Sequence, residues 1–492
     1  MSLINVKNLT FAYDGSHDNI FENVSFMLDT DWRLGLTGRN GRGKTTFLKL
    51  LMGKYPFSGS ISADVEFEYF PYEVAEKQRL TLEIITAMLP DIQEWEIVRE
   101  LNLLKTADDL LYRSFETLSN GEQTKVLLAA LFLKHNRFLL IDEPTNHLDM
   151  EARAVVGNYL RQKSGFILVS HDRALLDGCI NHIMSVNKSD IDIQKGNFSS
   201  WWQNKERQDS FEQVTNDKLK KHIKRLEQTA KQKASWSDKV EKTKYATKNS
   251  GLHPDRGYVG HKAQKMMKRA KSLENRQQSA IEEKSKLLKN IEFTQILKIQ
   301  PLEYRAATLI GLEKVTIHYS GRIVCPNISF SVKCGDRIAL CGANGSGKSS
   351  LLKLILNEDI PYSGNILRGS GLKISYVRQD ASWLSGNLSE YAREQKIDES
   401  LFKAILRKLD FSRIQFEKDM CDFSAGQKKK VLIARSLCEQ AHLYIWDEPL
   451  NFIDVYSRIQ IETLLKTYQP TVLFVEHDRA FGQEIATKTV QL

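Results

Sequence analysis

The stretch NVSFMLDTDWRLGLTGRNGRGKTT (Asn23–Thr46) returns 304 residues later as NISFSVKCGDRIALCGANGSGKSS (Asn327–Ser350). In each stretch an apolar run typical of a β-strand leads into the pattern GxxxxGK[ST], and a helical pattern follows. Glycine lets backbone N–H groups approach phosphate oxygens closely, and the positive end of the following helix attracts the same negative charge. Each stretch therefore predicts a phosphate-binding loop between a strand and a helix.

Three further blocks keep nearly the same spacing between the two halves of the chain. LSNGEQTKV from Leu118 matches FSAGQKKKV from Phe423 at an offset of 305, LIDEP matches IWDEP at 305, and VSHDRA matches VEHDRA at 306. Four blocks in register indicate a tandem repeat of one whole domain. Strand patterns alternate with helical patterns in each copy, which predicts an α/β fold with a largely parallel sheet. We expect the first copy to span residues 1–202 and the second 304–492.

The residues between the copies, 203–303, have a different pattern. Apolar side chains recur at helical spacing on both sides of a Gly- and Pro-containing turn at about 249–261, which predicts a long antiparallel α-helical hairpin. A single helix over Lys205–Asn249 would be roughly 65 Å long. The segment from Lys205 to Glu292 carries 23 Lys and Arg against 12 Asp and Glu, a balance of +11, whereas the rest of the chain sums to −2. This concentration predicts an acidic partner for the linker.

The composition indicates a globular, cytoplasmic protein. Hydrophobic residues make up 41% of the 492 residues, and no apolar run approaches the ~18 residues that a membrane helix needs. The N-terminal residues lack the basic-then-apolar pattern of a signal peptide. The six cysteines form no CxxC pair, so we expect reduced thiols rather than disulfides or a zinc site.

The two loops predict how the chain holds a nucleoside triphosphate. Lys44 and Lys348 should reach the β- and γ-phosphates, and the hydroxyls of Thr45 and Ser349 should hold Mg²⁺. The expected ATP-binding residues of the loops are Gly38, Arg39, Asn40, Gly41, Arg42, Gly43, Lys44, Thr45 and Thr46 in the first copy, and Gly342, Ala343, Asn344, Gly345, Ser346, Gly347, Lys348, Ser349 and Ser350 in the second.

The strands that end in Asp-Glu supply the second part of the predicted chemistry. Asp142 and Asp447 are placed to bind Mg²⁺, and Glu143 and Glu448 to polarise the attacking water as general bases. The next strand of each copy is followed by an imidazole that would contact the γ-phosphate, and these residues are His171 and His477. The sequence thus predicts two sites that hydrolyse ATP to ADP and phosphate.

LSNGEQ, from Leu118 to Gln123, resembles the signature motif of ATP-binding cassette (ABC) ATPases. The resemblance implies that two nucleotides are sandwiched between the copies, each phosphate loop facing the signature of the other copy. It places Gln379 in a Q-loop, as a catalytic residue and Mg²⁺ ligand, and Asp149 and Asp454 in D-loops. The residues that then join the ATP sites are Tyr13 and Tyr319, stacked on adenine, Ser119, Gly121 and Glu122, facing the Lys348 loop, and Ser424, Gly426 and Gln427, facing the Lys44 loop.

Two departures from that pattern fall on the same composite site. Tyr72 stands where the second copy has Gln379, and Gln427 stands where the first copy has Glu122. Both positions belong to the site built on Lys44. We therefore expect a degenerate Lys44 site and a Lys348 site that is the better hydrolase.

The whole chain resembles the ABC-F family of translation factors, which have two fused cassettes, no membrane span and a basic helical linker. EPTNHLD, from Glu143 to Asp149, is typical of that family, whereas EPLNFID in the second copy departs from it. The resemblance implies a monomer whose own cassettes pair when they bind ATP and Mg²⁺, without membrane subunits. Its partners would be the ribosomal exit site, with large-subunit rRNA, and the P-site tRNA, and its linker would extend toward the peptidyl-transferase centre.

Within ABC-F the linker sequence GLHPDRGYVGHKAQKMMKRAK resembles that of the Lsa-type antibiotic-resistance proteins. The first cassette is also compact, with 75 residues from Lys44 to Ser119 against 76 from Lys348 to Ser424. This resemblance implies protection of the ribosome from lincosamides, streptogramin A and pleuromutilins. The tip residues expected near rRNA and the drug site are Lys244, His253, Arg256, Tyr258, His261 and Lys262.

Three other functions are compatible with parts of the pattern. A housekeeping ABC-F factor would act on stalled or initiating ribosomes without drug specificity, and it is the main alternative. The chain could also be the ATPase pair of a membrane importer, but that function does not explain the long basic linker. A DNA-repair ATPase of the zinc-bearing kind is disfavoured by the cysteine spacing.

Overall fold

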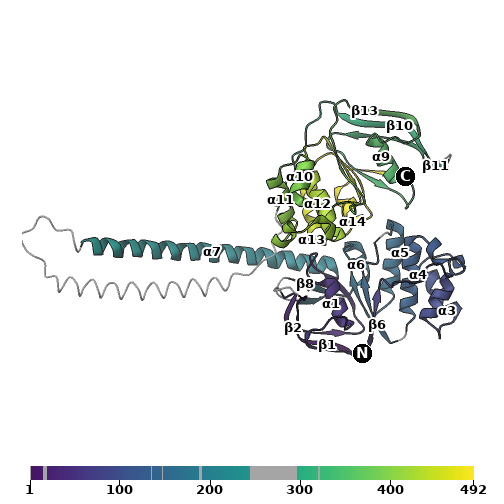
Figure 1. Cartoon of the computed structure of the whole chain (residues 1–492), viewed down its shortest axis with the longest axis horizontal. Coiled ribbons are helices and arrows are strands. Elements are labelled where there is room, and N and C mark those ends of the chain that lie inside the picture. Colours follow the sequence, from purple (N-terminus) through teal and green to yellow (C-terminus); the bar gives the residue numbers. More distant parts are fainter. Residues whose placement is uncertain are drawn as a thin grey trace, which may run out of the picture. The chain divides into compact units, whose positions relative to one another are not determined.

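The computed structural model of the chain describes residues 2–14, 19–134, 136–146, 148–187, 191–243, 296–319 and 322–492 (Figure 1). The chain divides into two compact units, one formed by Met1–Trp201 together with Thr294–Leu492 and the other by Trp202–Phe293. The first unit holds both copies of the repeat, and the second holds the segment between them.

Each copy has a small antiparallel sheet and a larger sheet that is mainly parallel. In the first copy the antiparallel sheet has the order β2-β1-β4, and the larger sheet has the order β5-β6-β7-β3-β8-β9, in which only β9 is antiparallel to its neighbour. The bounds are β1 Leu3–Phe11, β2 Phe21–Asp29, β3 Arg33–Thr37, β4 Ser58–Ser62, β5 Glu66–Phe70, β6 Arg137–Asp142, β7 Phe166–Val169, β8 His182–Val186 and β9 Ile191–Lys195.

The second copy repeats this plan. Its antiparallel sheet has the order β11-β10-β13, and its parallel sheet has the order β14-β15-β16-β12-β17. The bounds are β10 Thr308–Tyr319, β11 Arg322–Lys333, β12 Arg337–Cys341, β13 Tyr362–Arg368, β14 Ile374–Val377, β15 Leu443–Asp447, β16 Val472–Val475 and β17 Lys488–Gln491. The expected pair of α/β domains with largely parallel sheets is confirmed.

The helices of the two copies also correspond. In the first copy they are α1 Lys44–Leu51, α2 Thr81–Met88, α3 Glu94–Leu103, α4 Asn120–Phe132, α5 Met150–Arg161 and α6 Arg173–Cys179, with short 3₁₀ turns η1 Asp108–Tyr112 and η2 Phe115–Thr117. In the second they are α9 Lys348–Ile355, α10 Leu388–Glu394, α11 Glu399–Lys408, α12 Ala425–Cys438, α13 Val455–Tyr468 and α14 Arg479–Ile485, with η3 Arg413–Glu417 and η4 Met420–Asp422.

Alternating side chains of the buried strands place a hydrophobic core on each face of the parallel sheet. In β15, Leu443 and Ile445 join the cluster that contains α9 and the antiparallel sheet. Tyr444 and Trp446 point to the opposite face and join the cluster that contains α10 to α14. This period-2 pattern, with both faces apolar, is what a parallel strand covered by helices on both sides requires. The polar side chains Asp142 and Asp447 stand at the carboxyl ends of β6 and β15.

The second unit contains most of helix α7, which runs from Phe198 to Thr243 over 46 residues (Figure 1). At a rise of 1.5 Å per residue, this helix is about 69 Å long. It begins inside the first copy, where Phe198 and Trp201 are buried and Asp177 accepts a hydrogen bond from the backbone N–H of Ser199 at 2.7 Å. The second helix of the predicted hairpin and its tip lie outside the described residues. Where the structure is described, no helix has the length and hydropathy to cross a bilayer.

Candidate nucleotide-binding sites

The strand order of each parallel sheet brings the sequence motifs to one edge. In the first copy β3 leads into the phosphate loop, and its neighbour β7 leads to His171. The next strand, β6, ends at Asp142, and β5 beyond it leads toward Tyr72. Because these strands are parallel, their carboxyl ends meet at the same edge, where α/β proteins bind ligands. The second copy repeats the order with β12, β16, β15 and β14.

Both phosphate loops have the same internal geometry. The Lys44 ammonium donates hydrogen bonds to the carbonyls of Gly38 at 2.8 Å and Arg39 at 3.2 Å. The Lys348 ammonium donates to the equivalent carbonyls, those of Gly342 and Ala343, at 2.9 Å each. The last glycine of each loop has a φ of 89°, which a side chain rarely adopts, and it directly precedes the first residue of α1 or α9. Each loop therefore presents backbone N–H groups beside a lysine, as a bound polyphosphate requires.

The side chains expected to hold Mg²⁺ lie together in both copies. The Thr45 hydroxyl donates to Asp142 Oδ2 at 2.8 Å, and Ser349 is hydrogen-bonded to Asp447. Oδ1 of Asp447 is buried without a hydrogen-bond partner among the described residues. A hydroxyl beside a carboxylate with a free oxygen fits a magnesium ion that takes its other ligands from phosphates and water.

The expected general bases each lie beside an imidazole. His171 Nε2 is 3.4 Å from Glu143 Oε1, and His477 Nε2 is 3.5 Å from Glu448 Oε1. Burial and then the Asp142 carboxylate raise the pKa of Glu143 to about 8. Burial also acts to raise the pKa of Glu448, but hydrogen bonding to His477 and other favourable contacts outweigh burial and lower that pKa. The two glutamates therefore have opposite electrostatic environments.

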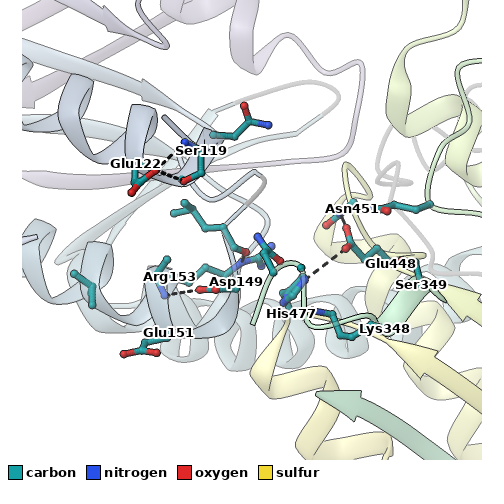
Figure 2. A pocket seen from close by; sticks show the side chains of 18 of the residues that line it. Ser119, Glu122, Asp149, Glu151, Arg153, Lys348, Ser349, Glu448, Asn451 and His477 are labelled. Carbon is teal, nitrogen blue, oxygen red and sulfur yellow. Dashed lines mark hydrogen bonds and ion pairs between the residues drawn. The ribbon is translucent and has the colours of Figure 1, made fainter. Parts of the chain in front are cut away.

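The composite Lys348 site surrounds an open cavity of about 810 Å³. Figure 2 shows Ser119, Glu122 and Asp149 of the first copy across from Lys348, Ser349 and His477 of the second. Gln379, which is hydrogen-bonded to Glu448, also lines the cavity. The structure thus brings the Gly342 loop to the signature of the other copy. The predicted residues that line this cavity are Ser119, Gly121, Glu122, Asp149, Asn344, Gly345, Gly347, Lys348, Ser349, Ser350, Gln379, Glu448 and His477.

At the composite Lys44 site the phosphate loop of the first copy contacts the signature region of the second. The Asn40 side chain donates to the carbonyl of Phe452, in the second copy, at 2.8 Å. A Cβ added to Gly426 would lie 2.8 Å from Asn40 Nδ2 and 2.4 Å from the Phe452 carbonyl oxygen. Among the described residues, a Cβ on the equivalent Gly121 would meet Leu148 at 3.3 Å, and His147, at the position of Phe452, lies outside them. At the Lys44 site, therefore, Asn40 of the first copy lies against the signature glycine and the Phe452 carbonyl of the second.

The aspartates expected in the D-loops cap helices and reach across to the other copy. Asp149 Oδ1 accepts the backbone N–H of Ala152, and Asp454 Oδ1 accepts that of Ser457, each at 2.9 Å. Burial lowers the pKa of Lys44, and the Asp454 carboxylate is the largest influence that opposes it. Each of these carboxylates thus has a structural role as well as an electrostatic one.

The two sequence departures, Tyr72 at the Q-loop position and Gln427 in the signature motif, differ in their structural consequences. Tyr69 pairs with Leu140 and Tyr376 with Ile445, a register that places Tyr72 at the position of Gln379. The exchange of Glu122 for Gln427 is milder, because both side chains cap their helices. Ser119 N donates to Glu122 Oε2 at 2.8 Å and Ser424 N donates to Gln427 Oε1 at 2.9 Å.

The remaining predicted residues are placed as follows. The Tyr13 hydroxyl is 2.8 Å from Thr46 Oγ1, so its half-exposed ring lies beside the phosphate loop. Tyr319 is the last residue of β10, and its side chain is not among those described. The tip residues Lys244, His253, Arg256, Tyr258, His261 and Lys262 lie outside the described residues.

Sequence reasoning missed three polar residues at these sites. Asn451 donates to Glu448 Oε2 and lines the cavity. Its partner in the repeat is Asn146, so the offset of 305 could have revealed it. Lys105 and Asp410 share the same offset and lie at opposite composite sites, but their opposite charges concealed the equivalence.

Comparison with known proteins agrees with this geometry. The family model described as ABC transporter matches residues 21–146 and 325–451, which together exceed half of the chain. The chain is 29% identical to the ATP-binding protein Uup of Buchnera aphidicola over 99% of this chain and 80% of that protein. It is 28% identical to the ribosome protection protein VmlR of Bacillus subtilis over 96% of this chain and 83% of that protein.

Solved structures show the same fold at lower sequence identity. The archaeal ribosome recycling factor aABCE1, in a complex with the ribosomal stalk protein aP1, aligns with a TM-score of 0.64 at 17% identity, over 98% of this chain and 87% of that one. A structure named RNase-L Inhibitor aligns with a TM-score of 0.62 at 17% identity, over 99% and 87%. The chain belongs to the ABC transporter family of ATPases, as an ABC-F member with two tandem ATPase domains.

Proposed function

We propose that the protein binds the ribosome when ATP closes its two cassettes, and that it protects the peptidyl-transferase centre from lincosamides, streptogramin A and pleuromutilins. The observation that carries the proposal is the match to VmlR, a protein named for ribosome protection, over 96% of this chain. The match spans the linker as well as the cassettes. A ribosomal partner also accounts for a linker with a balance of +11, because cations bind rRNA phosphates.

ATP is the ligand that would join the cassettes. In the Lys348 site the phosphate loop comes from the second cassette and Ser119 from the first, and both line one cavity. A nucleotide held by both walls stabilises the closed state by its differential affinity for that state. One chain completes both composite sites, so the protein would act as a monomer without membrane subunits.

We assign the hydrolytic roles from the geometry of the sites. The loop lysines hold the polyphosphate, and Thr45 with Asp142 and Ser349 with Asp447 hold Mg²⁺, which supplies charge neutralisation during phosphoryl transfer. Glu448 accepts the proton of the attacking water, while His477 and Gln379 orient its carboxylate. Glu143 and His171 have the equivalent places at the Lys44 site.

The linker would extend from the exit site toward the drug site and the P-site tRNA. Tyr258 in the predicted Gly-flanked turn would stack on an unpaired rRNA base, with Lys262 beside rRNA phosphates. The ABC-F resemblance supports these assignments, and a protein with a ribosomal partner would act in the cytoplasm.

The second candidate function is that of a housekeeping ABC-F factor without drug specificity. It is favoured by the match to Uup, named only as an ATP-binding protein, which is as similar to this chain as VmlR is. Both functions require binding to the ribosome, so they differ in the consequence of binding rather than in its mechanism.

One experiment tests ribosome binding for both candidates. The double variant Glu143→Gln, Glu448→Gln should stay closed on ATP, and it should co-sediment with ribosomes in the presence of ATP. The matched control is the same variant with ADP. If the ATP-bound variant remains in the supernatant, the ribosome proposal is wrong.

A susceptibility assay then separates the two candidates. Cells that express the unmodified protein should tolerate higher concentrations of all three drug classes, and Tyr258→Ala should weaken this tolerance. The ribosome-free ATPase rate of that variant is the folding control. Unchanged susceptibility in cells that express the unmodified protein would favour the housekeeping function.

A further inference from the structure

Lys105 and Asp410 occupy equivalent positions with opposite charge. Each lies two residues beyond its helix, α3 or α11, and each has a positive φ, 49° for Lys105 and 70° for Asp410. The backbone N–H of Lys105 donates to Asn102 at 3.0 Å, and that of Asp410 donates to Arg407 at 3.0 Å. Because the local backbone is the same, the two side chains project from equivalent positions on the surfaces of their cassettes.

At the Lys44 site this position reaches the phosphate loop of the other cassette. Asp410 Oδ1 is 3.6 Å from Arg39 Nη1, and Asp410 Oδ2 is 3.7 Å from Arg42 Nη2. The Arg39 guanidinium also lies 5.3 Å from the centre of the Tyr456 ring, across the same interface. The two arginines of this phosphate loop, Arg39 and Arg42, therefore form ion pairs with a carboxylate of the other cassette.

At the Lys348 site the corresponding loop positions carry no charge. They are Ala343 and Ser346, at an offset of 304 from the two arginines. Lys105 lines the same cavity as the loop residues Gly345 and Lys348, and its side chain is exposed. Within the part of the chain that is described, Lys105 forms no ion pair.

We propose that Lys105 binds the polyphosphate of the nucleotide in the Lys348 site, supplied in trans by the first cassette, whereas its equivalent Asp410 binds the loop arginines of the Lys44 site. At the Lys348 site the cation lines the cavity of a loop made for phosphate and has no carboxylate partner among the described side chains, so its charge is available to the ligand. At the Lys44 site the equivalent residue is the acidic Asp410, which links the two cassettes through its ion pairs with Arg39 and Arg42.

The proposal predicts a binding effect that depends on charge. In a Glu143→Gln background, hydrolysis reports mainly on the Lys348 site. Lys105→Met should then raise the KM for ATP about tenfold and leave kcat within about twofold, because the contact is made in the ground state and the transition state alike. Lys105→Glu should raise KM further, and Lys105→Arg should restore it to within about threefold of its value in the Glu143→Gln parent.

The salt dependence of KM gives a second readout. A phosphate contact weakens as salt screens it, so raising the ionic strength should increase the KM of the parent more steeply than that of Lys105→Met. The matched control is Asp410→Asn, which removes the charge at the equivalent position and should change the KM less than Lys105→Met does.

Two results would overturn the proposal. One is an unchanged KM in a folded Lys105→Glu variant. The other is an equal rise in KM for Lys105→Met and Lys105→Arg, because packing rather than charge would then be the cause. The unfolding temperature of each variant shows whether it is folded.

Discussion

The Lys44 and Lys348 sites are built from equivalent residues of two copies of one domain, yet they meet the opposite copy differently. At the Lys44 site Arg39 and Arg42 of the phosphate loop form ion pairs with Asp410 of the other cassette. At the Lys348 site the corresponding loop residues are uncharged, and Lys105 of the other cassette lines the cavity of about 810 Å³. Duplication supplied the same strands, loops and acids twice. A few substitutions at the facing surfaces then gave the two sites different charges.

The largest expected effect compares the two general bases. Glu448→Gln should lower single-turnover ATP hydrolysis about 100-fold or more, because a positioned general base contributes about 10²–10⁴-fold. Glu143→Gln should lower it less than about tenfold, since the Q-loop position of its site holds Tyr72. Both variants are measured with radiolabelled ATP at saturating protein. Equal losses would show that the two sites hydrolyse ATP equally.

The next comparison sets the signature glycine of the Lys44 site against a glycine of helix α14. Gly426→Ala should destabilise the protein by about 2 kcal/mol, because the new Cβ would overlap the Phe452 carbonyl oxygen at 2.4 Å. Gly482→Ala is the control and should be neutral or stabilising, because its Cβ would meet no described atom within 4 Å and alanine favours the helix. Thermal unfolding without nucleotide measures both. Equal unfolding temperatures for the two variants would contradict close packing at Gly426.

The Q-loop positions should differ by a smaller factor. Gln379→Ala should slow hydrolysis about tenfold, because it removes a hydrogen bond to the Glu448 carboxylate. Tyr72→Ala, at the equivalent position, should slow it less than about twofold. The rates are compared at saturating ATP. A greater loss in Tyr72→Ala would mean that the Lys44 site carries the turnover.

The smallest expected effect comes from an ion pair between the cassettes. Arg173 of α6 is bound to Glu462 of α13, and both side chains are largely buried. Arg173→Ala should cost about 1 kcal/mol in unfolding free energy. Arg479→Ala is the matched control, because Arg479 is exposed and Gly157 stands at the position equivalent to Glu462. If both variants lose the same unfolding free energy in urea denaturation, the Arg173–Glu462 pair does not stabilise the interface.

Much of the fold could be predicted because the signals are local and occur twice. The glycine pattern of the phosphate loops and the apolar strands before Asp142 and Asp447 indicated a parallel sheet with its chemistry at one edge. The first residue of α7 was harder to predict. The spacing of apolar residues suggested a helix that begins at Lys205, whereas α7 begins at Phe198, because Phe198 and Trp201 are buried in the first copy. Tertiary packing stabilised a helical turn that the sequence pattern alone did not mark.

The sequence by itself determined the duplication, the two phosphate loops and the acids that follow them, because each depends on residue types at short or repeated spacings. Only the tertiary structure decided which surfaces of the two copies touch. Asp410 and Arg42 are far apart in the chain, and nothing in either neighbourhood marks them as partners. Their carboxylate and guanidinium meet at 3.7 Å because the folded cassettes face each other there. Coulombic attraction weakens with distance and with exposure to solvent. The charge of residue 105 or 410 therefore affects binding only where folding brings it close to an opposite charge at that interface.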